Sequence, residues 1–332
     1  MLINHLILHV LDFVSGICVF SQNEHPLDNP IVNDFIIKHI RRAKSDFKAN
    51  TGVFRNSSPI MPLIGRSEVT SESFVIISSK IADLVYKGLI NSDNPGIIDL
   101  IVVDLSLDNE SFLAVLMVDS KTAFTHQVVN ANGVVNSFII QHHSILPSVT
   151  QKIESYAVIN KQTQEIVFSD KRRYIDGKDV FVLRDYVLQC SAAASGKDII
   201  KSVSNIVTKV AEAHGQNSAV ALSKAKNFIL ENAEVTDILM PVDIGKEVFA
   251  DSEEQQHDYN ELAQEAHLPK KIKLEQKNAV RTGKNHKIKT DTGIELTIPT
   301  AYFDNHRFVE FINNPDGTIS IELKNIGRII NK

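Results

Sequence analysis

A short run of base-type and nucleophile-type side chains is the first place in this sequence to look for a reaction. His142-His143-Ser144 supplies two imidazoles and a hydroxyl, and Asp170 or Asp185 could orient one of the rings. A catalytic triad is defined by geometry rather than by residue type. The sequence contains no Gly-x-Ser-x-Gly elbow that would hold the serine. Residue type is therefore the only support for a hydrolase.

Paired carboxylates offer a second chemistry. Asp104 and Asp119 lie on neighbouring predicted strands and could hold the metal of a nuclease, although aspartates at strand ends near turns are far commoner. A phosphate-cradling loop is excluded, because Arg281-Thr-Gly-Lys-Asn285 lacks both the upstream glycine and the following Ser or Thr. We expect no catalytic residue and no cofactor.

Histidines and cysteines do not form a metal site in the sequence. His5 and His9 share one face of the first predicted strand, without a cysteine or carboxylate cluster beside them, so we expect partly exposed strand histidines. Cys18 and Cys190 are the only cysteines and have no zinc-ligand spacing. The sequence predicts no metal, and two distant thiols indicate a reducing, cytoplasmic setting.

Charge is the remaining feature that could bind a ligand. The chain carries a net charge of −5, but residues 266–332 hold 12 Lys and Arg against 7 Asp and Glu. Lysine and arginine bind phosphates without reading bases. The predicted DNA-binding residues are those of one basic segment, Lys270, Lys271, Lys273, Lys277, Arg281, Lys284, Lys287 and Lys289, with Lys171, Arg172 and Arg173. A solvated linker is the alternative for the segment, and the basic face of a helix over residues 30–48 is a second candidate.

The bulk composition is that of an ordinary globular protein. Hydrophobic residues make up 43% and charged residues 23% of the 332 positions, which supplies enough apolar side chains for a sizeable core. The apolar N-terminus has no basic region before it and is interrupted by Asp12, so it is a poor signal peptide. No apolar run approaches the roughly 20 residues that span a bilayer, and we expect no membrane partner.

Three predicted hairpins follow one another in the middle of the chain. Each pairs two runs rich in β-branched residues across a polar turn, and Asn132-Gly133 is a strong type I′ signal because both residues need positive φ. The paired runs are 97–105 with 112–118, 125–130 with 134–141, and 156–160 with 165–170. Together they predict an antiparallel β-meander.

Helical patterns surround this meander. The fold class we predict is α+β, in which the antiparallel meander packs with helices and is followed by a helical connector and a small C-terminal β region. The helices are expected over residues 30–48, 197–214 and the acidic stretch 247–265. The predicted domains are an α+β domain at 1–192, a helical connector at 193–268 and a basic β region at 269–332.

Several stretches are similar to one known family. The sequence resembles the bacterial nucleoid-associated proteins of the NdpA/YejK type, in the same order along nearly the whole chain. The stretches that carry the resemblance are Phe112-Leu-Ala-Val-Leu-Met-Val-Asp-Ser-Lys-Thr-Ala-Phe-Thr-His126, Asp170-Lys-Arg-Arg-Tyr-Ile-Asp-Gly-Lys-Asp-Val-Phe-Val-Leu-Arg-Asp-Tyr-Val187, Lys287-Ile-Lys-Thr-Asp-Thr-Gly-Ile-Glu-Leu-Thr-Ile-Pro299 and Asn313-Asn-Pro-Asp-Gly-Thr-Ile-Ser-Ile321.

The resemblance implies a non-enzymatic protein of the cytoplasm that associates with the nucleoid and binds DNA without strong sequence preference. It also implies a connection to type II topoisomerases. A protein-interaction module that reaches the nucleoid through such a partner is the alternative, with an acidic surface that docks a basic protein. An exposed sheet edge is compatible with a homodimer.

Overall fold

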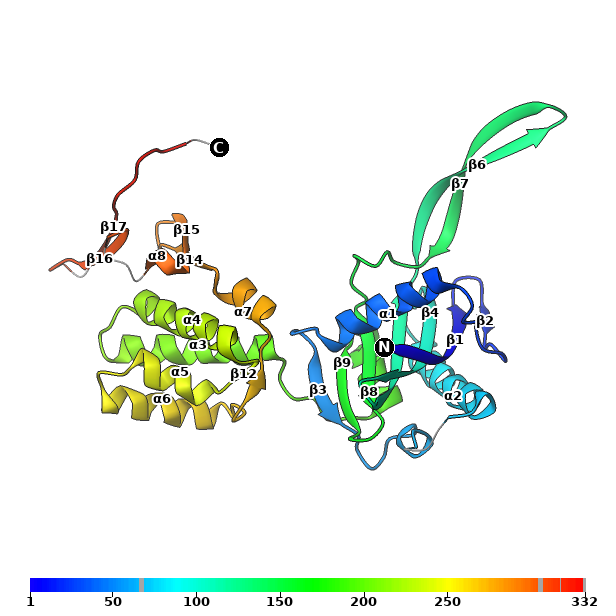
Figure 1. The fold of residues 1–332 in the computed structure, drawn as a ribbon, viewed down its shortest axis with the longest axis horizontal. Helices are drawn as coiled ribbons and strands as arrows, with labels where there is room; N and C mark the ends of the chain where they lie inside the picture. Colours follow the sequence, from blue (N-terminus) through cyan, green and yellow to red (C-terminus); the bar gives the residue numbers. More distant parts are fainter. Residues whose placement is uncertain (66–68, 304–306, 317, 331–332) are drawn as a thin grey trace. The chain divides into compact units, whose positions relative to one another are not determined.

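The chain forms two compact units, Met1–Ser195 and Gly196–Lys332, in a computed structural model (Figure 1). The structure describes residues 1–65, 69–303, 307–316 and 318–330. Both helices and strands are abundant in the two units, which confirms the predicted α+β class. Each unit is described by itself below.

A seven-stranded antiparallel sheet forms the centre of the first unit. Its order is β2-β1-β4-β5-β8-β9-β3, and every neighbouring pair runs antiparallel. The predicted pairings of the first and third hairpins are confirmed as β4 with β5 and β8 with β9. The strands are β1 (Leu2–Asp12), β2 (Ile17–Val19), β3 (Asn50–Val53), β4 (Ile97–Leu107), β5 (Glu110–Asp119), β8 (Ser155–Asn160) and β9 (Glu165–Ser169).

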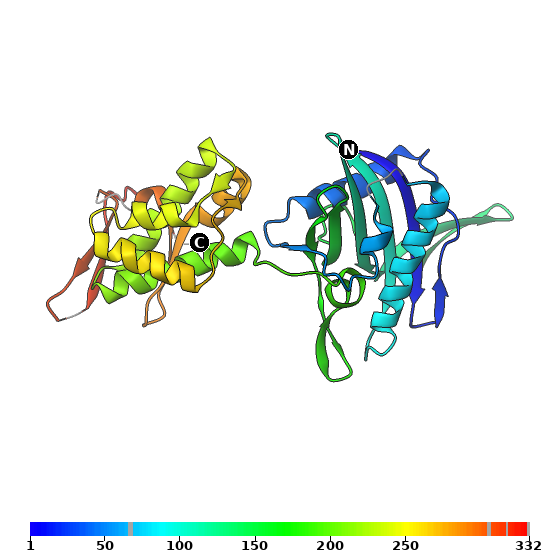
Figure 2. The ribbon, with the colours of Figure 1, turned by 90° about the horizontal axis from the view of Figure 1, so that it is seen from below.

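The middle hairpin forms as predicted but does not belong to the sheet. β6 (Lys121–Ala131) and β7 (Val134–Ile145) pair only with each other among the described strands, and β5 pairs directly with β8. The expectation of one continuous meander is therefore wrong at this point. Asn132 and Gly133 have φ of 54° and 83°, as a type I′ turn requires. Figures 1 and 2 show this hairpin extending away from the sheet.

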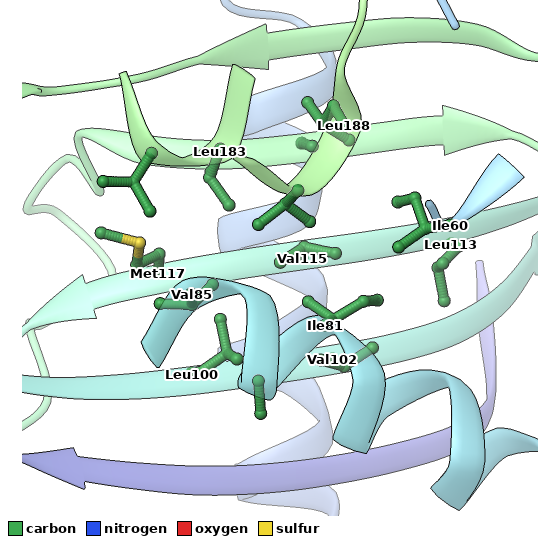
Figure 3. Packing of buried hydrophobic residues seen from close by; sticks show 14 of the residues in the cluster. Ile60, Ile81, Val85, Leu100, Val102, Leu113, Val115, Met117, Leu183 and Leu188 are labelled. Atoms are coloured by element: carbon green, nitrogen blue, oxygen red, sulfur yellow. The ribbon is translucent and has the colours of Figure 1, made fainter. Parts of the chain in front are cut away.

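The sheet is covered on both faces, which explains why its central strands are apolar at nearly every position. On one face, Leu100, Val115 and Met117 pack against α2 (Ser71–Leu89) and a π-helical turn at Leu183–Leu188 (Figure 3). On the other face, Ile101 and Leu116 pack against α1 (Pro30–Lys44). Alternate side chains of one strand thus belong to two separate hydrophobic cores, one on each face of the sheet.

Local signals at the helix starts agree with these positions. Asn29 caps α1, because its side-chain oxygen accepts the Ile31 N–H at 3.0 Å, and Pro30 occupies the first helical position. Thr70 caps α2 in a reciprocal capping box with Ser73. Each cap satisfies backbone donors that would otherwise lack partners at the helix end.

His9 is fully buried, so the expectation of a partly exposed strand histidine is wrong for this residue. Its Nδ1 accepts the Ser21 N–H at 3.0 Å, and burial lowers the pKa of His9 to about 4. His5 lies within 3.0 Å of Glu24 and is largely covered. Both faces of β1 pack against other elements, and a two-residue alternation cannot reveal that.

The second unit begins with a helical bundle. α3 and α4 pack side by side, α5 and α6 pack on them, and α7 packs on α4. The helices expected over 197–214 and within 247–265 are confirmed, and the apolar stripe of α3, which includes Ile199, Val203 and Val207, is buried. The helices are α3 (Gly196–Ala213), α4 (Ser218–Val235), α5 (Pro241–Val248), α6 (Glu253–Glu265) and α7 (Gln276–Gly283).

Close approach of α5 and α6 depends on a glycine. A Cβ added at Gly245 would overlap the ring of Tyr259, whose hydroxyl donates to the Pro241 carbonyl at 2.7 Å. Tyr259 is completely buried, and its phenol is satisfied by that bond. The glycine thus lets the acidic helix α6 lie directly on α5.

Two small hairpins form the predicted C-terminal β region of the unit. β14 (Asn285–Lys289) pairs with β15 (Glu295–Pro299), and β16 (Val309–Asn313) pairs with β17 (Ile319–Leu323). Their apolar faces and α8 (Thr300–Phe303) enclose a small core of Ile298, Phe303 and Val309, to which Ala219 of α4 adds. The basic segment runs directly into this core.

Candidate nucleic-acid interface

The basic segment 270–289 is folded, and its apolar residues hold it against the second unit. Ile272 and Leu274 are buried beside the short ladder of β12 (Ile238–Leu239) and β13 (Ile272–Lys273). Ala279 is buried in α7, and a Cβ at Gly283 would lie 2.8 Å from Leu230 Cγ. The solvated-linker alternative is therefore wrong for this segment.

Because the apolar residues face inward, the lysines face solvent. Lys287 and Lys289 lie on the face of β14 opposite to Ile288, which packs against the C-terminal core. All of the predicted lysines in the segment are exposed, namely Lys270, Lys271, Lys273, Lys277, Lys284, Lys287 and Lys289. The side chain of Arg281 lies outside the described part of the structure.

Few acids neutralise these lysines. Lys277 lies 2.8 Å from Glu275 and Lys289 lies 3.4 Å from Glu295, and such pairs are weak because both lysines are exposed to water. Five others form no ion pair with any residue that the structure describes, namely Lys270, Lys271, Lys273, Lys284 and Lys287. These five ammonium groups are available to bind an anion.

A buried hydrogen-bond pair fixes the middle of the segment. The Thr300 hydroxyl donates to the Gly283 carbonyl, and the Thr300 N–H donates to the Lys284 carbonyl at 3.0 Å. Thr300 is 1% exposed, so these bonds are shielded from water. The C-terminal end of α7 and the start of β14 are thereby tied to α8, and the lysines around them project from a fixed backbone.

The acidic residues of the unit gather elsewhere. α6 carries exposed carboxylates at Glu253, Glu254, Glu261 and Glu265, and it packs on α3 and α5 rather than on α7. Figure 1 shows α6 and α7 on opposite sides of the α3–α4 pair. The glutamates of α6 therefore lie apart from α7 and its Lys277, although the chain as a whole is acidic.

One protein-family model matches the sequence over almost the full length of the chain. Residues 7–330 match the family model of the nucleoid-associated protein YejK. The chain belongs to this family. The match covers both units, so the resemblance read from the sequence is confirmed from the first strand to the last hairpin. No curated protein matches the chain.

The second set of predicted DNA-binding residues in this YejK-family chain has carboxylate partners. Arg173 is 8% exposed and its Nη2 lies 2.9 Å from Asp119 Oδ1. Lys171 lies 3.3 Å from the same carboxylate, and Arg172 lies 3.2 Å from Asp179 across the hairpin of β10 (Arg172–Ile175) and β11 (Lys178–Phe181). Their charges are largely balanced inside the first unit.

The two aspartates considered for a nuclease are far apart. Asp119 pairs with Ile98 on β4, six residues from Asp104, which places the carboxylates about 20 Å apart along the strand. Asp104 is also not a strand-end residue beside a turn, since it is 3% exposed and bound to Lys161 at 2.7 Å. The residues described here contain no group of three His, Cys, Asp or Glu side chains that could hold a metal.

The hydrolase hypothesis fails on the position of its serine. The Ser144 hydroxyl donates to Asp99 at 3.3 Å and to the Ser120 hydroxyl at 2.9 Å, and the side chain of His143 lies outside the described part. Asp185 binds Arg184 at 2.7 Å. Burial raises the pKa of Asp170 to about 6, and this carboxylate accepts the Arg184 backbone N–H at 3.0 Å. Neither acid is bound to an imidazole of the described residues.

The basic face of α1 is partly engaged in structure as well. Lys38 lies 2.6 Å from Asp34, and the Arg42 guanidinium donates to the Thr150 carbonyl at 2.7 Å. Lys44 lies over the Phe112 ring, 3.9 Å from its centroid. These contacts leave the basic segment as the better candidate. No helix within the described residues has both the length and the apolar character needed to cross a membrane.

Proposed function

We propose that this chain is a non-catalytic nucleoid-associated protein that binds DNA without strong sequence preference through the lysines of the basic segment. Five exposed lysines without acidic partners in the described structure carry this proposal. Membership of the YejK family supports the nucleoid as the place of action. Lysines make point-charge contacts to phosphates and do not read base edges.

The shape of the segment also supports sequence-independent binding. Base reading in the major groove uses a helix or β-ribbon that places several side chains on base edges. α7 has only eight residues and is held against α4, and the lysines are spread from Lys270, before β13, to Lys289 in β14. Such a spread suits a row of backbone phosphates better than a single groove.

Salt dependence tests direct binding. We expect the intact chain to bind labelled duplexes of unrelated sequence with similar affinity, measured by fluorescence anisotropy. The logarithm of the affinity should fall linearly with the logarithm of the salt concentration, with a slope of about −4 to −6 for five to seven phosphate contacts. A chain that binds no duplex even at low salt would contradict direct binding.

A second function is favoured by the acidic helix α6. Its exposed glutamates could dock a basic protein, so that the chain reaches the nucleoid through a partner such as a type II topoisomerase. Purification from nuclease-treated lysate separates the two functions. A partner that stays bound after DNA is removed, from a chain that binds no duplex by itself, would favour this alternative.

A further inference from the structure

The hairpin of β6 and β7, hereafter the arm, lacks the usual protection of an isolated pair of strands. β6 and β7 pair only with each other among the described strands, so both long outer edges are open. Proteins normally shield such edges with charged residues, proline or a covering element. No Asp, Glu, Lys or Arg occurs between Lys121 and Lys152, in a chain that is 23% charged.

Both faces of the arm carry exposed apolar side chains among uncharged polar ones. The strand register places Phe124, Val128, Val135 and Ile139 on one face, and Val129, Val134 and Phe138 on the other. All seven are exposed, Ile139 by 83% and Phe124 by 70%. The first face exposes roughly 500 Å² and the second roughly 300 Å², and apolar patches of this size on a monomer are often functional.

The base of the arm is well anchored. Ser144 of β7 donates to Asp99 of β4, and Ser120, just before β6, donates to the same carboxylate. Asp99 is 5% exposed. The arm therefore leaves the sheet from a fixed point, and its apolar surface is displayed by the fold. A lone two-stranded hairpin is only marginally stable in water, so such a surface calls for a partner.

We propose that two copies of this chain associate through their arms. In a two-fold symmetric dimer, the same surface of each copy contacts its counterpart on the other copy. A charged residue near the axis would therefore lie close to the same charge on the partner. A surface without charges avoids this repulsion. The larger apolar face supplies roughly 500 Å² of the roughly 800 Å² that each partner contributes to an interface of standard size, and the open strand edges beside it can add backbone contacts. An arm without charge offers little attraction to DNA phosphates or to a charged protein. This inference stands independently of DNA binding.

Sedimentation velocity of the intact chain tests the proposal. We expect the wild-type chain to sediment as a dimer of the 37.0 kDa chain at micromolar concentration. The double variant Phe124→Glu/Ile139→Glu places like charges on one face of both arms, and it should shift the dissociation constant upward by at least about 100-fold. The matched control Val14→Glu/Ile76→Glu changes two exposed apolar residues outside the arm and should remain dimeric.

A second variant with a shortened arm keeps the test valid if the charged variant does not fold. Deleting residues 126–129 and 136–139 removes equal numbers from both strands, which keeps the register and the Asn132-Gly133 turn. This variant should be monomeric, with the far-ultraviolet circular dichroism of a folded chain. A monomeric wild-type chain would overturn the proposal, and so would a dimer that survives in both arm variants.

Discussion

Replacing Lys270, Lys271, Lys273 and Lys287 by glutamate will weaken DNA binding by at least about 100-fold at moderate salt, and it will flatten the salt dependence. Each phosphate contact contributes about 1 to the slope of the logarithmic salt plot, so losing four should reduce the slope by about 4. All four side chains are exposed and form no ion pair in the described structure. Their replacement should therefore leave the fold of the second unit intact.

A matched variant separates a local contact from the effect of net charge. Four exposed lysines of the same unit lie on α3 and α5, away from the segment, namely Lys197, Lys201, Lys209 and Lys246. Changing these four to glutamate alters the net charge equally. Anisotropy titrations should show a small affinity loss and nearly the wild-type slope. Equal losses in the two variants would mean that overall charge, not the segment, governs binding.

Lys161→Met will strongly destabilise the first unit. Lys161 and Asp104 are both buried and lie 2.7 Å apart, and Asn4 donates to the other carboxylate oxygen at 2.9 Å. Removing one partner of a buried ion pair leaves an uncompensated charge, which costs about 3–5 kcal/mol. Hydrogen exchange of the β4 and β5 amides, read by mass spectrometry, should accelerate by roughly two to four orders of magnitude.

Two further variants show whether the cause is the unpaired charge. Lys161→Met/Asp104→Leu removes both charges and should recover most of the lost stability, because a buried pair and an apolar pair are often similar in energy. Lys87→Met breaks an exposed pair with Asp83 at 2.8 Å and should change stability by less than about 1 kcal/mol. A double variant as unstable as Lys161→Met would assign the loss to packing instead.

Local signals predicted the elements of this fold well. Asn132-Gly133 specified its turn, and the small C-terminal β region lies within the predicted range 269–332. Strand order was harder to predict, because it depends on contacts between residues distant in sequence. β1 pairs with β4, and β5 pairs with β8. The local pattern of apolar and polar residues does not indicate either pairing.

At the candidate site, too, local composition was predictive and contacts between distant residues were not. Counting charges located the segment 270–289, whose lysines are exposed because the intervening apolar residues are buried. The same counting selected Arg173, but its partner Asp119 lies 54 residues earlier and cannot be seen from composition. The arm did leave a signal, since the absence of charge between Lys121 and Lys152 distinguishes it from the strands around it.

The two proposals have a joint consequence. A pair of chains joined by their arms would carry two basic segments, and binding of one segment would raise the local concentration of DNA near the other. Disrupting the arms would then weaken DNA binding without changing any phosphate contact. The salt slope for each segment would stay the same.

Lysine acetylation footprinting of the intact chain, with and without duplex DNA, identifies most directly the amines that meet phosphates. We predict that DNA protects Lys270, Lys271, Lys273, Lys284 and Lys287 from acetylation, and that high salt removes this protection. Lysines of α3 should react equally in both states. Protection confined to other lysines, or no protection under conditions in which the chain binds DNA, would contradict the assignment of the basic segment as the DNA-binding surface.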